Sequence, residues 1–422
     1  MTLIGHDFLY DAEQSLLTYF PGDKPQVTSV LRGRTCETTI GSVRAAARAP
    51  DLDVRNLRHC VKLSFYRAAK LYTGLSYPWG SLTGVRPAKM LGLVSPEVLR
   101  KRYDVSAKRV RLCQSAYNAA QAAKATLSPG DTALYISIPF CPTRCAYCSF
   151  ISHDVKNAAK LMQPYVSALE RELDSLKPMS PVAIYIGGGT PTALSDDLLE
   201  RVLKKVNEFD LSKLREYTVE AGRPDTFTPD NMRLLRDYGA GRISVNPQSM
   251  NPEALAAIGR RHSPEATISA FELARGAGFQ AINTDVIAGL PADDLRGFKS
   301  TLDTIIGLRP ENITVHTLSL KRGAALTDNA NTDTAAMVDY SQQTLPKYGY
   351  KPYYLYRQKS AAFENVGWTL DGHECLYNLI MMEELADVAG AGAGAACKTI
   401  TDGRTNRRFN PKYPAEYNER WC

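Results

Sequence analysis

The chain has 422 residues, of which 44% are hydrophobic and 23% are charged. This composition is that of an ordinary folded protein and excludes a disordered or fibrous chain. The length suffices for one large domain of barrel size and a smaller one. No apolar run approaches the roughly 18 residues that a membrane span needs, and the opening residues lack the basic segment and apolar core of a signal peptide.

The net charge of +7 is unevenly distributed. Residues 1–130 contain 19 Lys and Arg against 9 Asp and Glu, whereas the remainder contains 32 against 35. A basic N-terminal part is either a solvated surface or a region that attracts nucleic acid, acidic lipids or a polycarboxylate ligand. Because no zinc-finger or RNA-binding signature accompanies it, no nucleic-acid partner is expected.

The first clear pattern is helical and covers residues 95–125. Ser95 followed by Pro96 is typical of a helix start, and Ala, Leu and Arg favour the interior. Pro129 and Gly130 then break the pattern and mark a boundary.

Short β-rich runs alternate with amphipathic helical stretches after this break, one of which has Ser195 as its expected N-cap. The expected strands are 132–138, 182–186, 216–220, 241–245, 282–287 and 312–318. Such alternation predicts an α/β fold with a parallel sheet. Six units favour a partial (β/α)6 TIM-like barrel, with a doubly wound open sheet as the alternative. We expect a basic α+β domain over 1–128, the barrel over 129–325, and a C-terminal extension that covers the substrate over 326–422.

Polar or glycine-rich residues follow or end most of these strands. In β/α barrels the chemistry gathers at the carboxyl ends of the strands, so these features are expected on one rim. They are a three-cysteine loop, the segment "GGGTPT" (187–192), Glu220, Asn246, Gln248, Asp285 and Ser319.

The cysteine loop, "IPFCPTRCAYCSF" (138–150), carries the strongest signal. Nine cysteines form an odd count, and Cys141, Cys145 and Cys148 lie close together, which argues for a reducing, cytoplasmic compartment and for metal binding rather than disulfides. A C-x3-C-x2-C loop can bind three corners of a cubane iron–sulfur cluster and leave the fourth iron open to a small molecule. The alternatives are a Cys3His zinc site with His153 as fourth ligand, or inert buried cysteines.

This loop resembles the signature of the radical S-adenosylmethionine (SAM) superfamily, in which an aromatic follows the cysteines. The resemblance implies a radical SAM barrel with a [4Fe-4S] cluster and SAM on its open iron. It also implies reductive cleavage of SAM to a 5′-deoxyadenosyl radical that abstracts hydrogen. The glycines of "GGGTPT" permit close approach to the methionyl part of SAM, although alone they could form a structural turn. The segment "AGAGAGA" lacks the full dinucleotide-binding pattern, so a Rossmann reading is rejected.

Longer segments of the sequence, among them "LYISIPFCPTRCAYCSF", "IYIGGGTPTAL" and "INTDVIAGLP", resemble the oxygen-independent coproporphyrinogen oxidase group. Two further segments, "WGSLTGVRPAKM" (79–90) and "GHECLYNLIMMEE" (372–384), resemble the HemZ-type branch of this group, coproporphyrinogen dehydrogenase. The resemblance implies one SAM on the cluster and, in the oxidases, a second SAM. Besides the three cysteines as metal ligands, it implies cofactor contacts at Tyr135, Phe150, Gly188, Gly189, Thr190, Glu220, Gln248, Arg260, Asp285 and Ser319. For Arg260 and Asp285 the alternative is an ordinary ion pair.

The group's activity would be oxidative decarboxylation of coproporphyrinogen III propionates to vinyls in haem biosynthesis, with an electron donor such as flavodoxin or ferredoxin. Arg404, Arg407 and Arg408 could then help to capture a tetracarboxylate. His316 is either a substrate contact or a core histidine. Phe150 stands where the oxidases carry a further cysteine, which keeps a haem chaperone and a haem-degrading radical SAM enzyme as alternatives.

Overall fold

The computed structural model describes residues 1–20, 22, 24–148, 152–319, 326, 333–358 and 361–421. The chain divides into two compact units. The first contains residues 1–118 and 355–365, and the second contains 119–354 and 366–422. Residues after 325 belong to both units, and the three-part division expected from the sequence stays a prediction.

The first unit contains a four-stranded sheet with the order β1-β2-β3-β4, in which β1 and β2 are parallel and the other pairs are antiparallel. The strands are β1 (Thr2–Ile4), β2 (Val27–Arg32), β3 (Thr35–Ile40) and β4 (Val43–Arg48). Inward residues alternate along β2 and β3, and helices α1 (Leu9–Tyr19) and α2 (Val54–Thr73) share their core. Because every second residue of these strands points to the same side, one face of the sheet is buried under the two helices.

The helical pattern over 95–125 forms two helices rather than one. They are α3 (Pro96–Tyr103) and α4 (Ala107–Ala125). Ser95 caps α3 as predicted, since its hydroxyl accepts from the Val98 N–H at 3.4 Å. Asp104 ends α3 with a left-handed φ of 57°, and Ser106 then accepts from the Arg109 N–H at 3.4 Å. The two helices are therefore separated by a local turn, which the helix-favouring composition of residues 95–125 did not indicate.

An eleven-stranded sheet, with the order β13-β14-β12-β11-β10-β9-β8-β5-β15-β16-β17, dominates the second unit. All six predicted strands are confirmed and pair in parallel: β5 (Thr132–Ile138), β8 (Ala183–Gly188), β9 (Glu216–Val219), β10 (Arg242–Ser244), β11 (Ala281–Ala288) and β12 (Asn312–Thr317). The added strands are β13 (Lys351–Arg357), β14 (Glu364–Thr369), β15 (Asp387–Ala391), β16 (Ala396–Thr401) and β17 (Arg404–Phe409).

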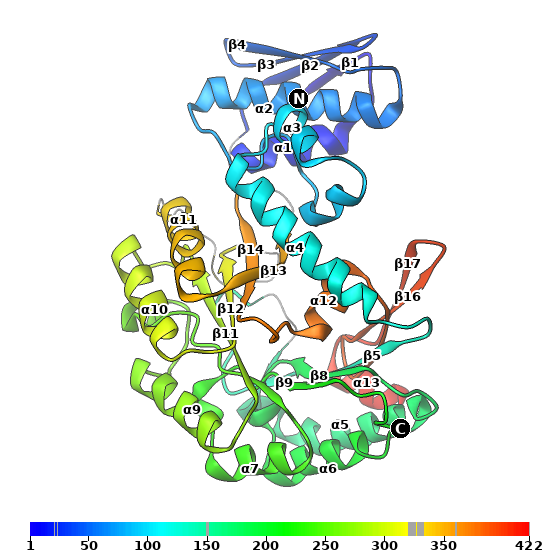
Figure 1. The fold of residues 1–422 in the computed structure, drawn as a ribbon, viewed down its shortest axis with the longest axis vertical. Helices are drawn as coiled ribbons and strands as arrows, with labels where there is room; N and C mark the ends of the chain where they lie inside the picture. The colour runs from blue at the N-terminus through cyan, green and yellow to red at the C-terminus, as the bar shows by residue number, and fades with distance from the viewer. Residues whose placement is uncertain are drawn as a thin grey trace. The chain divides into compact units, whose positions relative to one another are not determined.

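Helices lie on the outer side of the curved parallel sheet, where Figure 1 shows α5, α6, α7, α9 and α10 in an arc. This arrangement confirms the partial barrel and excludes a doubly wound sheet, which would carry helices on both faces. The helices of the second unit are α5 (Val155–Leu176), α6 (Asp196–Val206), α7 (Pro229–Asp237), α8 (Pro252–Ala257), α9 (Pro264–Gly276), α10 (Leu295–Gly307), α11 (Thr334–Thr344), α12 (Leu376–Glu383) and α13 (Pro414–Arg420).

Side-chain caps begin several of these helices. Thr228 and Asn231 form a reciprocal capping box at α7, and Asn251, Ser263 and Asp294 cap α8, α9 and α10. Ser195 precedes α6 as predicted, but its side chain makes no capping hydrogen bond. No helix among the described residues is long and apolar enough to cross a lipid bilayer.

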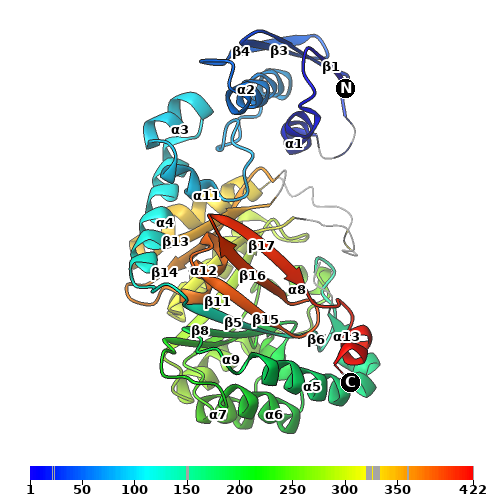
Figure 2. The ribbon, with the colours of Figure 1, turned by 90° about the vertical axis from the view of Figure 1, so that its right-hand side faces the viewer.

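The glycine- and alanine-rich segment 387–398 is structural. It forms β15, which pairs in parallel with β5, and then turns into β16, as Figure 2 shows. The turn needs Gly392, which has φ +96° and whose added Cβ would lie 2.4 Å from the Ser137 carbonyl oxygen. Buried Glu172 of α5 holds this segment by accepting from the Gly392 N–H, the Asn410 amide and the Tyr417 hydroxyl at 2.6–2.7 Å. The C-terminal extension is thus integrated into the sheet.

Candidate functional site

The cysteine loop is tied at both ends by short strands. Cys141 ends β6 (Phe140–Cys141), which pairs in parallel with β7 (His153–Asp154). The Cys148 N–H donates to the Cys145 carbonyl at 3.1 Å, and the Ala146 N–H donates to the Ile258 carbonyl at 2.9 Å. All three cysteines are free thiols and partly exposed. The loop therefore presents three thiols from one backbone curl at the carboxyl end of β5.

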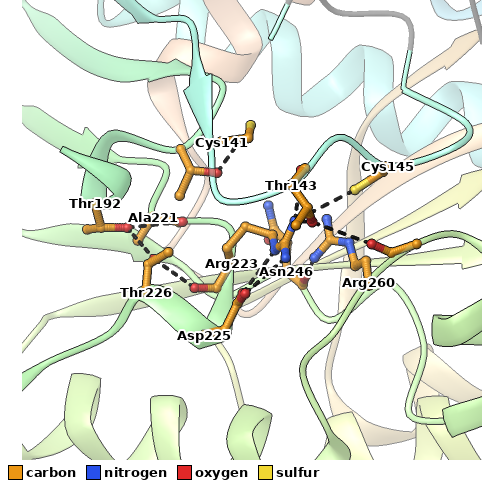
Figure 3. A network of polar contacts seen from close by, with 12 residues as sticks. Cys141, Thr143, Cys145, Thr192, Ala221, Arg223, Asp225, Thr226, Asn246 and Arg260 are labelled. Atoms are coloured by element: carbon orange, nitrogen blue, oxygen red, sulfur yellow. Dashed lines mark hydrogen bonds and ion pairs between the residues drawn. The ribbon is translucent and has the colours of Figure 1, made fainter. Parts of the chain in front are cut away.

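Neighbouring strand ends contact this loop, as Figure 3 shows. The Thr190 hydroxyl donates to the Cys141 sulfur at 3.6 Å. Arg223 donates to the Thr143 carbonyl at 3.2 Å and lies 4.0 Å from the Cys145 sulfur. Burial raises the pKa of the Cys141 thiol above its ordinary value. Metal coordination would offset this cost, since the thiolate is the form that binds.

The glycine-rich turn after β8 leaves no room for side chains. A Cβ on Gly189 would lie 2.5 Å from the Phe140 carbonyl oxygen, and Gly188 has φ +103°. The Gly189 and Thr190 N–H groups donate to the Ile138 and Phe140 carbonyls, both at 2.7 Å. The turn is thereby held against the start of the cysteine loop, so the predicted residues 188–190 lie beside Cys141.

The residues present fit a cubane cluster better than a single zinc ion. Three thiols share one loop at the C-x3-C-x2-C spacing that a cubane cluster with one open corner uses. His153, the alternative fourth ligand, packs its ring against Tyr413 with centroids 6.3 Å apart. The donor set is thus that expected for a cluster with one open corner.

The predicted SAM contacts Tyr135 and Glu220 lie together on the inside of the barrel. The Tyr135 ring stacks with Tyr185 at 6.3 Å and with Tyr377 of α12 at 5.9 Å. Tyr185 hydrogen-bonds Glu220, whose carboxylate lies so close to Gly187 that a Cβ there would be 2.6 Å from Glu220 Oε2. A carboxylate therefore rests directly on the glycine-rich turn.

The pKa of the Glu220 carboxyl lies well above its ordinary value. Burial first, and then the charge of Asp285, raise its pKa to about 8, while Tyr185, His316 and Arg260 oppose this shift. A cationic ligand at this position would favour the ionised form, because opposite charge lowers the pKa of a carboxyl group.

Gln248 and Arg260 are two further predicted cofactor contacts. Gln248 has φ +70°, and its backbone bridges β11 through the Asp285 carbonyl at 3.0 Å and the Ile287 N–H at 2.9 Å. Arg260 donates to the Asn246 carbonyl at 2.6 Å and to the Tyr147 hydroxyl at 3.3 Å. These contacts fix Arg260 beside the cysteine loop.

His316 Nε2 lies 3.5 Å from Asp285 Oδ2, so the two side chains are partners. A paired imidazole is compatible with a substrate contact and with a core histidine, so the role of His316 stays a prediction. Ser319 follows β12 and is partly buried. Phe150 lies outside the described residues. Arg404, Arg407 and Arg408 lie on β17 of the outer hairpin, where Arg407 pairs with Glu384 at 3.1 Å.

Sequence reasoning missed two side chains of the site, Tyr185 and Arg223. Tyr147 belongs to the cysteine signature, but the sequence gives no indication that it hydrogen-bonds Arg260. Arg223 comes three residues after Glu220, and this short spacing from an assigned strand end is the signal that could have found it. Tyr185 was counted only as a strand residue, because its partner Glu220 belongs to another strand.

The chain is similar to several known proteins. Residues 135–305 match the model of the Radical SAM superfamily. The chain is 36% identical over 397 residues to the oxygen-independent coproporphyrinogen-III oxidase-like protein HemZ of Bacillus subtilis (strain 168), which covers 87% of this chain and 79% of that protein. It is 31% identical over 292 residues to the heme chaperone HemW of Escherichia coli (strain K12), covering 67% and 74%.

Among solved structures, coproporphyrinogen III oxidase (HemN) from Escherichia coli, described as a radical SAM enzyme, shares the fold with a TM-score of 0.55 at 22% identity, over 71% of this chain and 72% of that one. Membership of the superfamily implies a [4Fe-4S] cluster and SAM, which the three-cysteine loop and the glycine turn fit. The chain belongs to the radical SAM superfamily and, within it, to the family of the HemZ-type coproporphyrinogen-III oxidase-like proteins.

Proposed function

We propose that this protein oxidatively decarboxylates coproporphyrinogen III to protoporphyrinogen IX by radical SAM chemistry. The observation that carries this proposal is the extent of the similarity to HemZ, which covers 87% of the chain. The similarity to HemW covers 67%. The similarity to the oxidase-like protein HemZ thus covers more of the chain than the similarity to HemW, and it extends beyond the residues of the barrel.

The site residues have roles that suit this chemistry. Cys141, Cys145 and Cys148 would hold three irons of a [4Fe-4S] cluster, and Gly188 and Glu220 would hold SAM. When bound, this pair of cofactors supplies a 5′-deoxyadenosyl radical that removes one hydrogen atom from the substrate. Each propionate would lose this hydrogen atom, CO2 and one further electron to become a vinyl group.

Arg260 and the Asp285–His316 pair provide charge for a polar ligand. The Nε–H of Arg260 is buried and has no hydrogen-bond partner in the described part of the chain, which leaves one donor for a carboxylate of the substrate or of a second SAM. The interior is also lined by the Tyr135, Tyr185 and Tyr377 rings. Flat aromatic surfaces with one charged donor suit a tetrapyrrole that carries propionates.

A haem-delivery function is the second candidate. Its support is the 31% identity to HemW over 292 residues. Such a protein would keep the cluster and bind haem without removing CO2 from a propionate.

Anaerobic incubation with coproporphyrinogen III, SAM and dithionite separates the two candidates. The enzyme is expected to form 5′-deoxyadenosine together with monovinyl and divinyl products, each detected by liquid chromatography and mass spectrometry. A flavodoxin or a ferredoxin is expected to replace dithionite as electron donor.

Cys145→Ala is the matched control and should form neither product. Tight haem binding with no 5′-deoxyadenosine and no vinyl product would overturn the decarboxylation and favour delivery. A methylated, ring-opened product from haem would instead indicate degradation.

A further inference from the structure

A buried arginine, Arg223, lies against the middle cysteine of the cluster loop. Its side chain is only 3% exposed. It follows Glu220 by three residues and lies in the turn after β9, whereas the loop follows β5. A fully desolvated guanidinium is costly unless its donors are satisfied, so its partners indicate what it does.

Asp225 anchors the guanidinium from one side. Arg223 Nε and Nη2 donate to the two oxygens of Asp225, both at 2.9 Å, which is a bidentate pair. The Thr226 hydroxyl also donates to the Arg223 carbonyl at 2.8 Å. Although burial opposes the shift, Arg223 holds the pKa of Asp225 below its ordinary value. The bidentate contact with Asp225 therefore fixes the orientation of the Arg223 guanidinium.

The remaining nitrogen, Nη1, faces the cysteine loop. It donates to the Thr143 carbonyl at 3.2 Å and to the Thr143 hydroxyl at 3.1 Å, and it lies 4.0 Å from the Cys145 sulfur (Figure 3). Thr143 in turn donates to the Gly259 carbonyl at 3.4 Å. The guanidinium thus holds the backbone between Cys141 and Cys145 and places a positive charge beside one ligand sulfur.

We propose that Arg223 positions the cluster loop and raises the reduction potential of its cluster, with Asp225 as the opposing charge. Reduction adds an electron, which a nearby cation stabilises and a nearby anion destabilises. His262 contributes no charge at neutral pH, because burial and Arg260 lower its pKa to about 4. The inference rests on cluster binding and is independent of the substrate, so it can fail while the proposed decarboxylation stands.

The sign of the potential shift distinguishes this role from a purely structural one. Arg223→Gln removes the cation and should lower the potential, whereas Asp225→Asn removes the anion and should raise it. Each change should alter the ratio of reduced to oxidised cluster, at the wild-type midpoint potential, by about tenfold in opposite directions. Arg223→Lys keeps the charge and should stay close to the wild type. A structural role alone predicts loss of cluster in both variants with no opposite signs.

The measurement is a mediated redox titration of the anaerobically reconstituted full-length protein, followed by electron paramagnetic resonance of the reduced cluster, with iron and sulfide content determined on the same samples. The matched control is the Arg233–Asp230 pair of α7, which also joins an arginine to an aspartate but is 68% and 75% exposed. Arg233→Gln and Asp230→Asn should leave the potential unchanged.

The proposal would be overturned if the reduction potential shifted in the same direction in Arg223→Gln and Asp225→Asn. It would also be overturned if neither variant changed the potential while both kept their full iron content. If Arg223→Gln binds no cluster, Arg223→Lys and Asp225→Asn decide the outcome. An upward shift in Asp225→Asn with an unchanged Arg223→Lys supports the proposal, and any other result contradicts it.

Discussion

The carboxylate of Glu216, the first residue of β9, accepts a hydrogen bond from the backbone N–H of Leu376, the first residue of α12, at 2.8 Å. It also accepts from the Tyr377 N–H at 3.0 Å and lies 3.4 Å from Arg242 Nε. An acidic side chain suits the N-terminus of a helix, where free N–H groups point outward. A strand of the barrel thus fixes a helix 160 residues further along the chain.

Glu216→Ala should destabilise the protein by about 3 kcal/mol, because it removes this cap and the carboxylate that lies 3.4 Å from buried Arg242. Equilibrium unfolding in urea, followed by circular dichroism, measures the change. Exposed Glu253 of α8 is the control, and its replacement by alanine should change the free energy of unfolding by no more than about 0.5 kcal/mol. Equal effects of the two substitutions would contradict the prediction.

In the first unit, Glu364 binds two residues from the N-terminal part of the chain. It accepts from Trp79 Nε1 at 2.6 Å and pairs with Arg109 Nε at 2.9 Å, and all three side chains are buried. Glu364→Ala should therefore cost about 3–5 kcal/mol, the usual penalty for leaving a buried charge unpaired. Glu97→Ala, which breaks an ion pair with Lys101 that is 69% and 75% exposed, should cost less than about 1 kcal/mol. Tryptophan fluorescence during urea unfolding reports both.

Gly189→Ala should disrupt the glycine-rich turn, because the new methyl group would overlap the Phe140 and Ile138 carbonyl oxygens at 2.5 and 2.8 Å. Backbone atoms cannot rotate away, so the turn must shift and weaken the Thr190–Cys141 contact. We expect at least a tenfold weaker SAM affinity, or about 1.4 kcal/mol, measured by isothermal titration calorimetry on the reconstituted protein. Gly307→Ala is the control, since a Cβ there meets nothing within 4 Å. Unchanged affinity in Gly189→Ala would show that the turn is not part of the SAM site.

The pKa of Glu220, raised by burial to about 8, makes the stability of the cofactor-free protein depend on pH. A carboxyl with a raised folded-state pKa contributes stability that is fully present below its unfolded value of about 4.5 and is lost as the pH rises through about 8. The wild type should therefore lose stability relative to Glu220→Gln between these limits, by at most about 5 kcal/mol. Urea unfolding of both proteins at pH 5, 7 and 9 measures the difference. A constant difference would show that Glu220 is ionised throughout.

Anaerobic reconstitution should give about four irons and four sulfides per chain, as a cubane site implies. Cys141→Ala, Cys145→Ala and Cys148→Ala should each lose the absorbance and the redox chemistry of the cluster. Cys397→Ala is the matched control, because this partly exposed cysteine lies on β16 and hydrogen-bonds Gly390. Stoichiometric zinc without sulfide would contradict the cluster assignment.

Local patterns predicted the barrel well. Each of the six parallel strands is a short run rich in residues that favour β-structure, and the cysteine spacing is fixed by the chain itself. These features depend on residues that are close in sequence, so they can be predicted without knowing the fold. The helix over 95–125 was less well predicted, since Asp104 in a left-handed conformation interrupts it.

The C-terminal strands and α12 were not predicted, because their partners are remote. β15 pairs with β5, and Glu216 caps α12, although more than 150 residues separate each pair. Thr143, which Arg223 contacts in the cysteine loop, likewise lies 80 residues earlier in the chain. No periodicity in a single segment records such contacts.

The sequence by itself determined the type of chemistry, because three thiols at C-x3-C-x2-C spacing can curl around one corner-open cluster wherever the loop is placed. Only the tertiary structure decided which charges surround that loop. Parallel strands bring their carboxyl ends together from distant parts of the chain, and this meeting places Arg223 beside Cys145, Thr190 beside Cys141 and Glu220 on the glycine turn. Electrostatic energy depends on distance in space, which a linear sequence does not contain.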